Sequence, residues 1–331
     1  MMRTRHILFI SKGIDSASTR YRALQFFPYF HDEGFTTEHL ATSGGLLAIL
    51  KILWQAPKAD IVVVIRKTFP AIVTWLLRLR SKCLIFDLDD AIFCRSNGLP
   101  SKTRMKRFAN IARVSDHIFA GNQFLVENAL RFNDRVTLIP TCLDVANYKI
   151  DVDKPNDFFD LVWIGSKSTS KYLIDVLPIL EKLAIKYPKL RLKIVADCEL
   201  PDTAIPVLVV PWSETNEIVE LATSQIGIAP MIDNNWTRGK CALKVLQYMA
   251  ANLPVVSSNV GVNAEVVISG ETGYLVSTSK QWTEAIEDLY LNELQSTVMG
   301  VAGNKRIVEY YDINIVFQRI LTILGAESCN P

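Results

Sequence analysis

Long apolar segments are missing from this sequence, because no run reaches the roughly 18 to 20 residues that a membrane-spanning helix needs. The apolar stretch near the start, residues 7–10, is too short for a secretory signal. The four histidines are not clustered and none of the six cysteines forms a Cys-x-x-Cys pair, so neither a zinc site nor a disulfide framework is indicated. We therefore expect a cytoplasmic protein with reduced thiols and no metal centre.

Two common phosphate-binding motifs are missing as well. The loop after the first apolar run reads Ser11-Lys-Gly-Ile-Asp-Ser-Ala-Ser-Thr-Arg-Tyr-Arg22. It lacks Gly-x-Gly-x-x-Gly, which argues against a nicotinamide site in this half, and it lacks Gly-x-x-x-x-Gly-Lys-Ser/Thr, which argues against a P-loop. Gly13 still permits close approach of a ligand to the backbone in this loop.

The chain has 331 residues, of which 49% are hydrophobic and 21% charged, so we expect two globular domains of roughly 150 residues each. The net charge is only +2, but residues 1–150 carry 21 Lys and Arg against 12 Asp and Glu, whereas residues 151–331 carry 15 against 22. A basic half suits nucleic acid, anionic lipid headgroups or a phosphorylated substrate. Nucleic acid is disfavoured, because the cations are not interleaved with aromatics in a recognised motif.

Short apolar runs rich in β-branched residues alternate with longer amphipathic segments, a pattern typical of parallel strands connected by helices. In the first half we predict strands at 6–11, 61–65, 83–86, 117–120 and 136–139, with helices at 20–32, 46–54, 71–80, 104–113 and 124–131. In the second half we predict strands at 160–164, 191–195, 207–210, 226–229 and 255–257, with helices at 172–186, 214–222, 242–251, 281–291 and 304–323. The polar segment 144–160 is the expected linker. The sequence therefore predicts two doubly wound α/β domains with functional residues in the loops after the strands.

Two pairs of cations lie next to predicted elements of the first half. Arg20 and Arg22 lie at a helix start, where their guanidinium groups either join the helix dipole in binding an anion or are simply solvated. Arg66 and Lys67 follow a strand directly.

Carboxylates follow the next strand, in Phe86-Asp-Leu-Asp-Asp-Ala91. Asp87 and Asp90 can bind substrate hydroxyls, hold a divalent cation or act as acid or base. The alternative is local loop chemistry, with Asp90 capping a short helix.

In the second half, Gly165 and Ser166 follow a strand and open a helix, so they can present donors to a diphosphate, although any tight strand-to-helix turn uses such residues. A sharper feature is the group of Arg238, Lys240 and Lys244 around a helix start in an otherwise acidic half. Such a cluster repels itself unless an anion neutralises it.

The segment Lys244-Val-Leu-Gln-Tyr-Met-Ala-Ala-Asn-Leu-Pro-Val-Val256, followed by Gly261, Glu265, Gly270 and Gly273, closely resembles the donor-site region of GT-B glycosyltransferases of the retaining, family-four type (glycosyl transferases group 1). Blocks that resemble one bacterial subgroup are Arg20-Tyr-Arg22, residues 86–91, Gly121-Asn122, Ile139-Pro-Thr141 with Asp144, and Gly165-Ser166. The resemblance covers nearly the whole chain. It implies two Rossmann-like domains facing a central cleft: an acceptor domain at 1–150, a nucleotide-sugar donor domain at 151–308, and a terminal helix at 309–331 that crosses back to the first domain.

The resemblance also implies roles for individual residues. Arg238, Lys240 and Lys244 would contact the donor diphosphate, and with Asp87 and Asp90 they form the predicted catalytic set. The predicted donor-binding residues are Gly13, Gly165, Ser166, Gln247, Gly261 and Glu265. The predicted acceptor-binding residues are Arg20, Arg22, Arg66, Lys67 and Asn122.

The sequence departs from the wider family at two positions. That family usually has two glutamates separated by seven residues, where this chain has Gly239 and Gln247. Gln247 can donate and accept hydrogen bonds, but it cannot provide an anion next to the anomeric carbon. The departure gives weight to an alternative, a nucleotide-sugar-binding scaffold that has lost catalysis; a nucleotide-sugar epimerase of GT-B architecture is a further one.

The predicted reaction is retaining transfer of a hexose-type sugar from a nucleotide diphosphate-sugar to a hydroxyl acceptor, in cell-surface polysaccharide, lipopolysaccharide or glycolipid biosynthesis. Arginine and lysine donors stabilise the leaving diphosphate, so no metal or other cofactor is required. The loop after the first strand has no histidine to act as the base of an inverting enzyme, which favours retention with the leaving phosphate taking the acceptor proton.

The acceptor is expected to be a saccharide or a lipid-linked carrier. The apolar segment 46–54 and the cations Lys102, Arg104, Lys106 and Arg107 suit peripheral contact with an anionic membrane at its inner face. The alternative is that the segment is a buried helix and that the cations are merely solvated.

Overall fold

The computed structural model describes residues 4–150, 152–155 and 157–325, and their contacts divide into two domains. The first domain contains the described residues up to Cys142, the segment Asn234–Cys241, and the described residues from Ile313 onward. The second contains the described residues of Leu143–Asp233 together with Ala242–Asp312. The observed division thus differs from the expected limits at residues 150 and 308, and the expected linker at 144–160 lies within the second domain.

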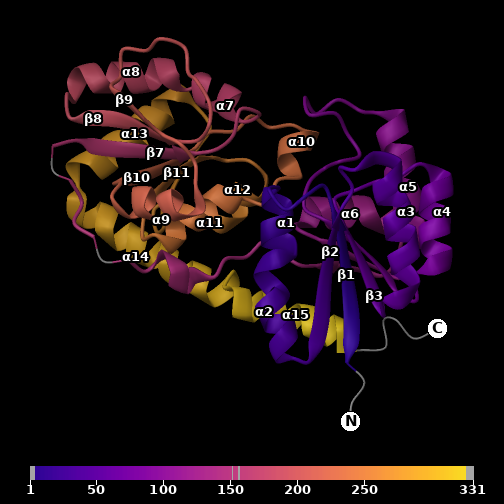
Figure 1. Ribbon diagram of the computed structural model, residues 1–331. Coiled ribbons are helices and arrows are strands. Elements are labelled where there is room, and N and C mark those ends of the chain that lie inside the picture. The colour runs from indigo at the N-terminus through magenta and orange to yellow at the C-terminus, as the bar shows by residue number, and fades with distance from the viewer. Residues whose placement is uncertain (1–3, 151, 156, 326–331) are drawn as a thin grey trace. The chain divides into compact units, whose positions relative to one another are not determined.

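The first domain is built on a six-stranded parallel sheet of order β2-β1-β3-β4-β5-β6 (Figure 1). Its strands are β1 (Arg5–Ser11), β2 (Phe35–Ala41), β3 (Ile61–Ile65), β4 (Leu84–Leu88), β5 (His117–Ala120) and β6 (Val136–Leu138). Its helices are α1 (Ala17–Arg22), α2 (Phe27–Asp32), α3 (Gly45–Gln55), α4 (Ala71–Arg80), α5 (Lys102–Val114), α6 (Gln123–Leu130), α10 (Asn235–Arg238) and α15 (Ile313–Gly325).

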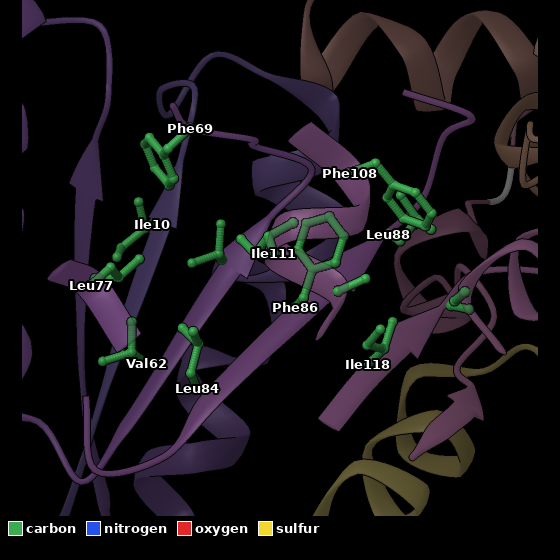
Figure 2. Close-up of a cluster of buried hydrophobic side chains, with 14 of the residues drawn as sticks. Ile10, Val62, Phe69, Leu77, Leu84, Phe86, Leu88, Phe108, Ile111 and Ile118 are labelled. Carbon is green, nitrogen blue, oxygen red and sulfur yellow. The ribbon is translucent and has the colours of Figure 1, made fainter. Parts of the chain in front are cut away.

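Both faces of this sheet are buried, because side chains alternate along each strand and every residue of the central strands β3 and β4 is buried. On one face, Leu77 of α4 and Phe108 of α5 pack over Phe86 and its neighbours (Figure 2). On the other face, Phe30 of α2 and Phe317 of α15 pack over the odd-numbered residues of β1. The helix at the end of the chain is therefore part of the core of the first domain.

The second domain repeats the architecture with a six-stranded parallel sheet of order β12-β11-β10-β7-β8-β9. Its strands are β7 (Phe159–Ile164), β8 (Leu190–Val195), β9 (Val207–Val210), β10 (Ile226–Ala229), β11 (Val255–Ser258) and β12 (Gly273–Val276). Its helices are α7 (Ser170–Ile174), α8 (Leu177–Lys186), α9 (Glu214–Ala222), α11 (Leu243–Ala250), α12 (Gly261–Val266), α13 (Ser279–Leu291) and α14 (Glu293–Tyr310). The expected doubly wound α/β class is confirmed.

The differences from the predicted elements have simple causes. The two strands that were not predicted, β2 and β12, are edge strands, and neither shows the fully buried apolar run of a central strand. The predicted helix 172–186 is divided into α7 and α8, with a proline in the first turn of α8. The predicted helix 304–323 is divided where α14 ends and α15 begins.

Two expectations on the class of protein can be compared with the structure. The thiols of Cys94, Cys142, Cys198 and Cys241 are free, but Cys83 is disulfide-bonded, so the expectation of reduced thiols is wrong at Cys83. Over the described ranges, none of the helices has both the length and the apolar character needed to cross a bilayer.

Candidate functional site

A buried ion pair lies near the carboxyl end of β4. Arg22 of α1 donates through Nε to Asp87 Oδ1 at 2.8 Å and through Nη2 to Asp87 Oδ2 at 2.7 Å. Its Nη1 donates to the carbonyl oxygens of Ile139 and Pro140 at 2.8 and 3.1 Å. Burial raises the pKa of Asp87, and Arg22 opposes that rise. The pair ties α1 and the segment after β6 to the sheet, and this geometry gives no support to the catalytic role expected for Asp87 or the acceptor-binding role expected for Arg22.

A second charged cluster follows β4. Asp90 is buried between two cations, with Lys240 Nζ 2.8 Å from Oδ1 and Arg66 Nη2 in contact with Oδ2. Arg66 has a left-handed backbone (φ 52°), and its Nη1 donates to Ser18 Oγ at 2.8 Å. Burial raises the pKa of Asp90, whereas Lys240 and Arg66 act to lower it. Because both carboxylate oxygens contact cations, Asp90 is suited to positioning Arg66 and Lys240 rather than to accepting a proton.

Lys240 reaches Asp90 from a segment that is distant from β4 in the sequence. This arm, Asn234–Cys241, packs within the first domain although the residues on both sides of it belong to the second. Its short helix α10 is capped by Asn234, whose Oδ1 accepts hydrogen bonds from the amides of Trp236 and Thr237 at 2.8 and 3.0 Å. Arg238, at the end of α10, is exposed.

The arm is held by Asn122 and by the absence of a side chain at Gly239. Asn122 Nδ2 donates to the carbonyl oxygens of Arg238 and Lys240 at 3.2 and 3.0 Å, while its Oδ1 caps α6. A Cβ added to Gly239 would lie 2.5 Å from the Cβ of Ala91, closer than packed carbons allow. Glycine at 239 is therefore explained by packing, and the Asn122 amide holds the arm rather than presenting itself to an acceptor.

Two predicted residues of the second domain, Gly165 and Lys244, meet at Trp163. This buried residue lies near the end of β7, and a Cβ on Gly165 would overlap its ring. Lys244, in the first turn of α11, has its Nζ 4.6 Å from the centroid of the same ring. A lysine beside the N-terminal amides of an eight-residue helix is a favourable arrangement for an anion such as a phosphate.

Three other predicted donor residues are exposed or half-buried in the second domain, one in the turn after β7 and two on α12. Ser166 is exposed, its amide donates to Thr169 Oγ1 at 3.1 Å, and its Oγ lies 2.9 Å from Ser168 Oγ. Gly261 opens α12 with φ 53°, a left-handed conformation that favours glycine. Glu265 is exposed on the same helix.

Gln247 lies inside the second domain. Its side chain is 2% exposed, and Nε2 donates to Glu217 Oε1 and to the Tyr148 hydroxyl at 3.3 Å. Glu217 also accepts from Trp212 Nε1 at 2.6 Å and from the Tyr148 hydroxyl at 3.2 Å. The Gln247 amide thus supports a buried carboxylate, and this geometry does not favour the sugar contact expected for it. Glu217 was not among the predicted residues, because in the sequence it reads as an ordinary residue of a helix start.

The remaining predicted residues are Gly13 in the loop after β1, Arg20 on α1 and Lys67 after β3. Gly13 has open space around it, the Arg20 guanidinium is 5.3 Å from the Tyr21 ring centroid, and Lys67 is half-buried. A residue pair that was not predicted is Ser11 and His39, whose Oγ and Nε2 lie 2.7 Å apart, and burial lowers the pKa of His39. The pair was hidden because His39 is on β2, the unpredicted edge strand.

The described part of the chain contains no group of three or more His, Cys, Asp or Glu side chains arranged to hold a metal ion. The charged groups that do come together are arginine and lysine beside aspartate in the first domain, and a lysine at a helix N-terminus in the second. The lysine at the helix N-terminus suits an anionic ligand, whereas the first-domain cations Arg22, Arg66 and Lys240 already contact Asp87 or Asp90.

Residues 159–292, most of the second domain, match the family model described as glycosyl transferases group 1. A search of curated protein sequences finds no match.

The whole chain is similar to several solved structures at low sequence identity. HepE of Anabaena, in complex with UDP and glucose, matches with a TM-score of 0.75 and 15% identity over 97% of this chain and 100% of that one. Sucrose-phosphate synthase of Thermosynechococcus elongatus matches with a TM-score of 0.76 and 13% identity, over 98% of this chain and 100% of that one. The lipopolysaccharide outer core galactosyltransferase WaaB matches with a TM-score of 0.63 and 12% identity, over 97% of this chain and 99% of that one. These matches extend over both domains, so the two-domain fold is shared as a whole.

Proposed function

We propose that the chain is a group 1 glycosyltransferase that transfers a hexose-type sugar from a nucleotide diphosphate-sugar to a hydroxyl acceptor with retention of configuration. The match of residues 159–292 to that family model and the fold shared with HepE and sucrose-phosphate synthase support this proposal. The nucleotide sugar is the only co-substrate in this proposal, and no metal is required. HepE has been solved with UDP and with UDP-glucose, which makes uridine diphosphate-sugars the first donors to test.

The observation that carries the proposal is the position of Lys244. Its ammonium group lies over Trp163, against which Gly165 also lies, and it stands in the first turn of α11. Breaking the bond between sugar and nucleotide leaves growing negative charge on the diphosphate. A fixed lysine and helix N-terminal amides stabilise that charge more in the transition state than in the ground state.

Retention is supported by the state of the carboxylates. Asp87 and Asp90 are each held by cations, so neither is placed as a free base for direct attack from the opposite face of the sugar. In the proposed reaction the acceptor hydroxyl attacks on the side that the diphosphate leaves, and its proton passes to a phosphate oxygen. The C–O bond to the nucleotide breaks as the new C–O bond forms.

The proposed acceptor is a saccharide or a lipid-linked carrier, in the assembly of cell-surface polysaccharide, lipopolysaccharide or glycolipid. The similarity to WaaB supports this class of product. Arg20 lies on α1, Lys67 follows β3, and both are half-buried. In this proposal these two cations contact an anionic acceptor.

We would test donor binding by thermal shift with UDP, GDP, ADP, CMP and dTDP and their sugar conjugates, with and without magnesium. One nucleotide at about a hundredfold excess over its Kd should stabilise the protein by about 2.7 kcal/mol without metal. Lys244→Ala should abolish most of that shift, while Lys182→Ala, an exposed lysine on α8, should leave it unchanged.

Turnover then separates the enzyme from a scaffold. The anomeric configuration of the product, read by NMR, should match that of the donor. A protein that binds one nucleotide sugar but transfers no sugar to any hydroxyl acceptor would instead be the degenerate binding protein that Gly239 and Gln247 suggest. No thermal shift with any nucleotide or nucleotide sugar of the panel would contradict the proposed function itself.

A further inference from the structure

The helix α3 is apolar on both of its sides. Ile52 is buried against the sheet of the first domain, and Ile49 and Leu53 pack beside it. The opposite side carries Leu46, Leu47, Leu50 and Trp54, all exposed, with Trp54 61% accessible. A surface helix ordinarily has a polar outer side, so an apolar one requires an explanation.

The neighbouring helix α4 continues this apolar surface. Its buried side carries Thr74 and Leu77, and its outer side exposes Ile72, Trp75 and Leu79 at a spacing of three and four residues. Figure 1 shows α3, α4 and α5 side by side on the first domain, and α4 contacts both of the others. We call the exposed residues the apolar face; they are Leu46, Leu47, Leu50, Trp54, Ile72, Trp75 and Leu79.

The charged residues of the three helices α3, α4 and α5 are all cations, one of which, Arg78, is paired with Asp116 at 3.0 Å. The helices α3, α4 and α5 contain no Asp or Glu. Their cations are Lys51, Arg78, Arg80, Lys102, Arg104, Lys106, Arg107 and Arg113. In addition, Lys58 Nζ lies 2.8 Å from the centroid of the Trp54 ring, so a cation stands directly on the apolar face.

We propose that the apolar face docks on an anionic lipid bilayer, with the two tryptophans at headgroup depth and the lysines and arginines over the phosphates. Leucine and tryptophan beside a cationic border is the composition of surfaces that lie in a membrane interface. Anionic headgroups neutralise these lysines and arginines. Each cation is attracted to the bilayer while it lies within about one Debye length of the bilayer surface.

A second copy of the chain fits this surface less well. A symmetric dimer through the apolar face would place the same cations opposite themselves, and like charges across an interface oppose association. The bilayer supplies both the apolar interior and the negative charge. The docking surface does not depend on the proposed sugar transfer, because none of its seven residues belongs to the predicted catalytic or binding set.

We would measure docking by flotation of the full chain with vesicles, without donor or acceptor. Vesicles of phosphatidylcholine with about a third phosphatidylglycerol should carry the protein at low salt, and vesicles of pure phosphatidylcholine should carry much less. Trp54→Ser with Trp75→Ser should lower the partition coefficient by roughly tenfold or more, because each tryptophan buries a large apolar area at the interface. Both side chains are exposed, so folding should be retained, as circular dichroism would verify.

The matched control is Leu294→Ser with Val298→Ser, which removes two exposed apolar side chains from α14 of the second domain. This variant should float like the wild type. Lys102→Glu with Lys106→Glu and Arg107→Glu should reduce binding to the anionic vesicles and weaken its salt dependence.

Two outcomes would overturn the proposal. One is a wild-type protein that stays in the soluble fraction with anionic vesicles at low salt. The other is a dimer by light scattering that the Trp54→Ser and Trp75→Ser variant converts to a monomer, which would assign the apolar face to a contact between copies. A further measurement places the two rings directly. Brominated lipid should quench the tryptophan emission of the wild type, and this quenching should be lost in the Trp54→Phe and Trp75→Phe double variant.

Discussion

At the scale of single residues, the pairing of Gln247 with Glu217 explains why an amide stands where the family that the sequence resembles has a carboxylate. Glu217 is buried and accepts hydrogen bonds from Gln247, Tyr148 and Trp212, all neutral donors. A carboxylate at 247 would place two negative charges in contact away from water, whereas an amide supplies a hydrogen-bond donor. The residue at 247 is therefore matched to its neighbour at 217.

We predict that Gln247→Glu lowers the free energy of unfolding by about 3 to 5 kcal/mol at neutral pH, the usual cost of an uncompensated buried charge. The folded-state pKa of the new carboxyl would be raised by burial and by Glu217. The variant protein should therefore keep its full stability at pH values below the pKa of this carboxyl in the unfolded state. It should lose stability as the pH rises through the pKa of the carboxyl in the folded state. Urea unfolding of variant and wild type at several pH values should show the difference narrowing in acid. A difference that does not change with pH would contradict this explanation.

At the scale of elements, the arm Asn234–Cys241 shows how a short segment becomes part of a domain that its neighbours in sequence do not belong to. Hydrogen bonds from Asn122 hold the backbone of the arm, and Lys240 pairs with Asp90. Gly239 permits the close approach to Ala91. The arm therefore brings two of the predicted cations, Arg238 and Lys240, to the first domain, and leaves Lys244 on α11 of the second.

Gly239→Ala tests this packing. The added Cβ would lie 2.5 Å from the Ala91 Cβ and 2.6 Å from the Ala91 backbone nitrogen, so the arm must move. We expect a loss of about 1 to 3 kcal/mol in unfolding free energy and faster amide exchange in α10. The same substitution at Gly13, where nothing lies within 4 Å, should be neutral or slightly stabilising. Equal effects at the two glycines would argue against a tightly packed arm.

At the scale of the whole molecule, the chain passes between the two domains more often than a two-domain order in sequence requires. It leaves the first domain after Cys142, returns for the arm, and returns again at Ile313. The last helix, α15, then completes the core of the first domain. Phe317 packs against the rings of Phe26, Tyr29 and Phe30 at centroid distances of 6.1, 5.4 and 5.0 Å.

We expect Phe317→Ala to destabilise the first domain by about 3 to 5 kcal/mol, as removal of a buried aromatic side chain does. Hydrogen exchange should accelerate in β1 and α2, residues almost three hundred positions away in sequence, and should stay unchanged in β7 and β8. Phe158→Ala, which removes an exposed ring from the second domain, is the control and should change little. Uniform acceleration across both sheets would show instead that the domains unfold as one unit.

The alternating apolar runs determine the α/β class, because only a parallel sheet covered on both faces buries every residue of strands such as β3 and β4. They do not reveal β2 and β12, since an edge strand needs less apolar surface. The pattern of residues 244–256 is local enough to show the resemblance to the group 1 glycosyltransferases from the sequence.

Contacts between distant segments were decided only by the tertiary structure. The pairs Arg22 with Asp87, Lys240 with Asp90, and Gln247 with Glu217 join positions 65, 150 and 30 residues apart. No spacing rule links such positions, so a charged residue that will be neutralised in a core looks the same in sequence as one that will meet a ligand. The outer side of α3 is the converse case. The sequence left open whether the apolar segment 46–54 contacts a membrane or forms a buried helix, and only the packing of Ile52 on the sheet shows which side of the helix remains exposed.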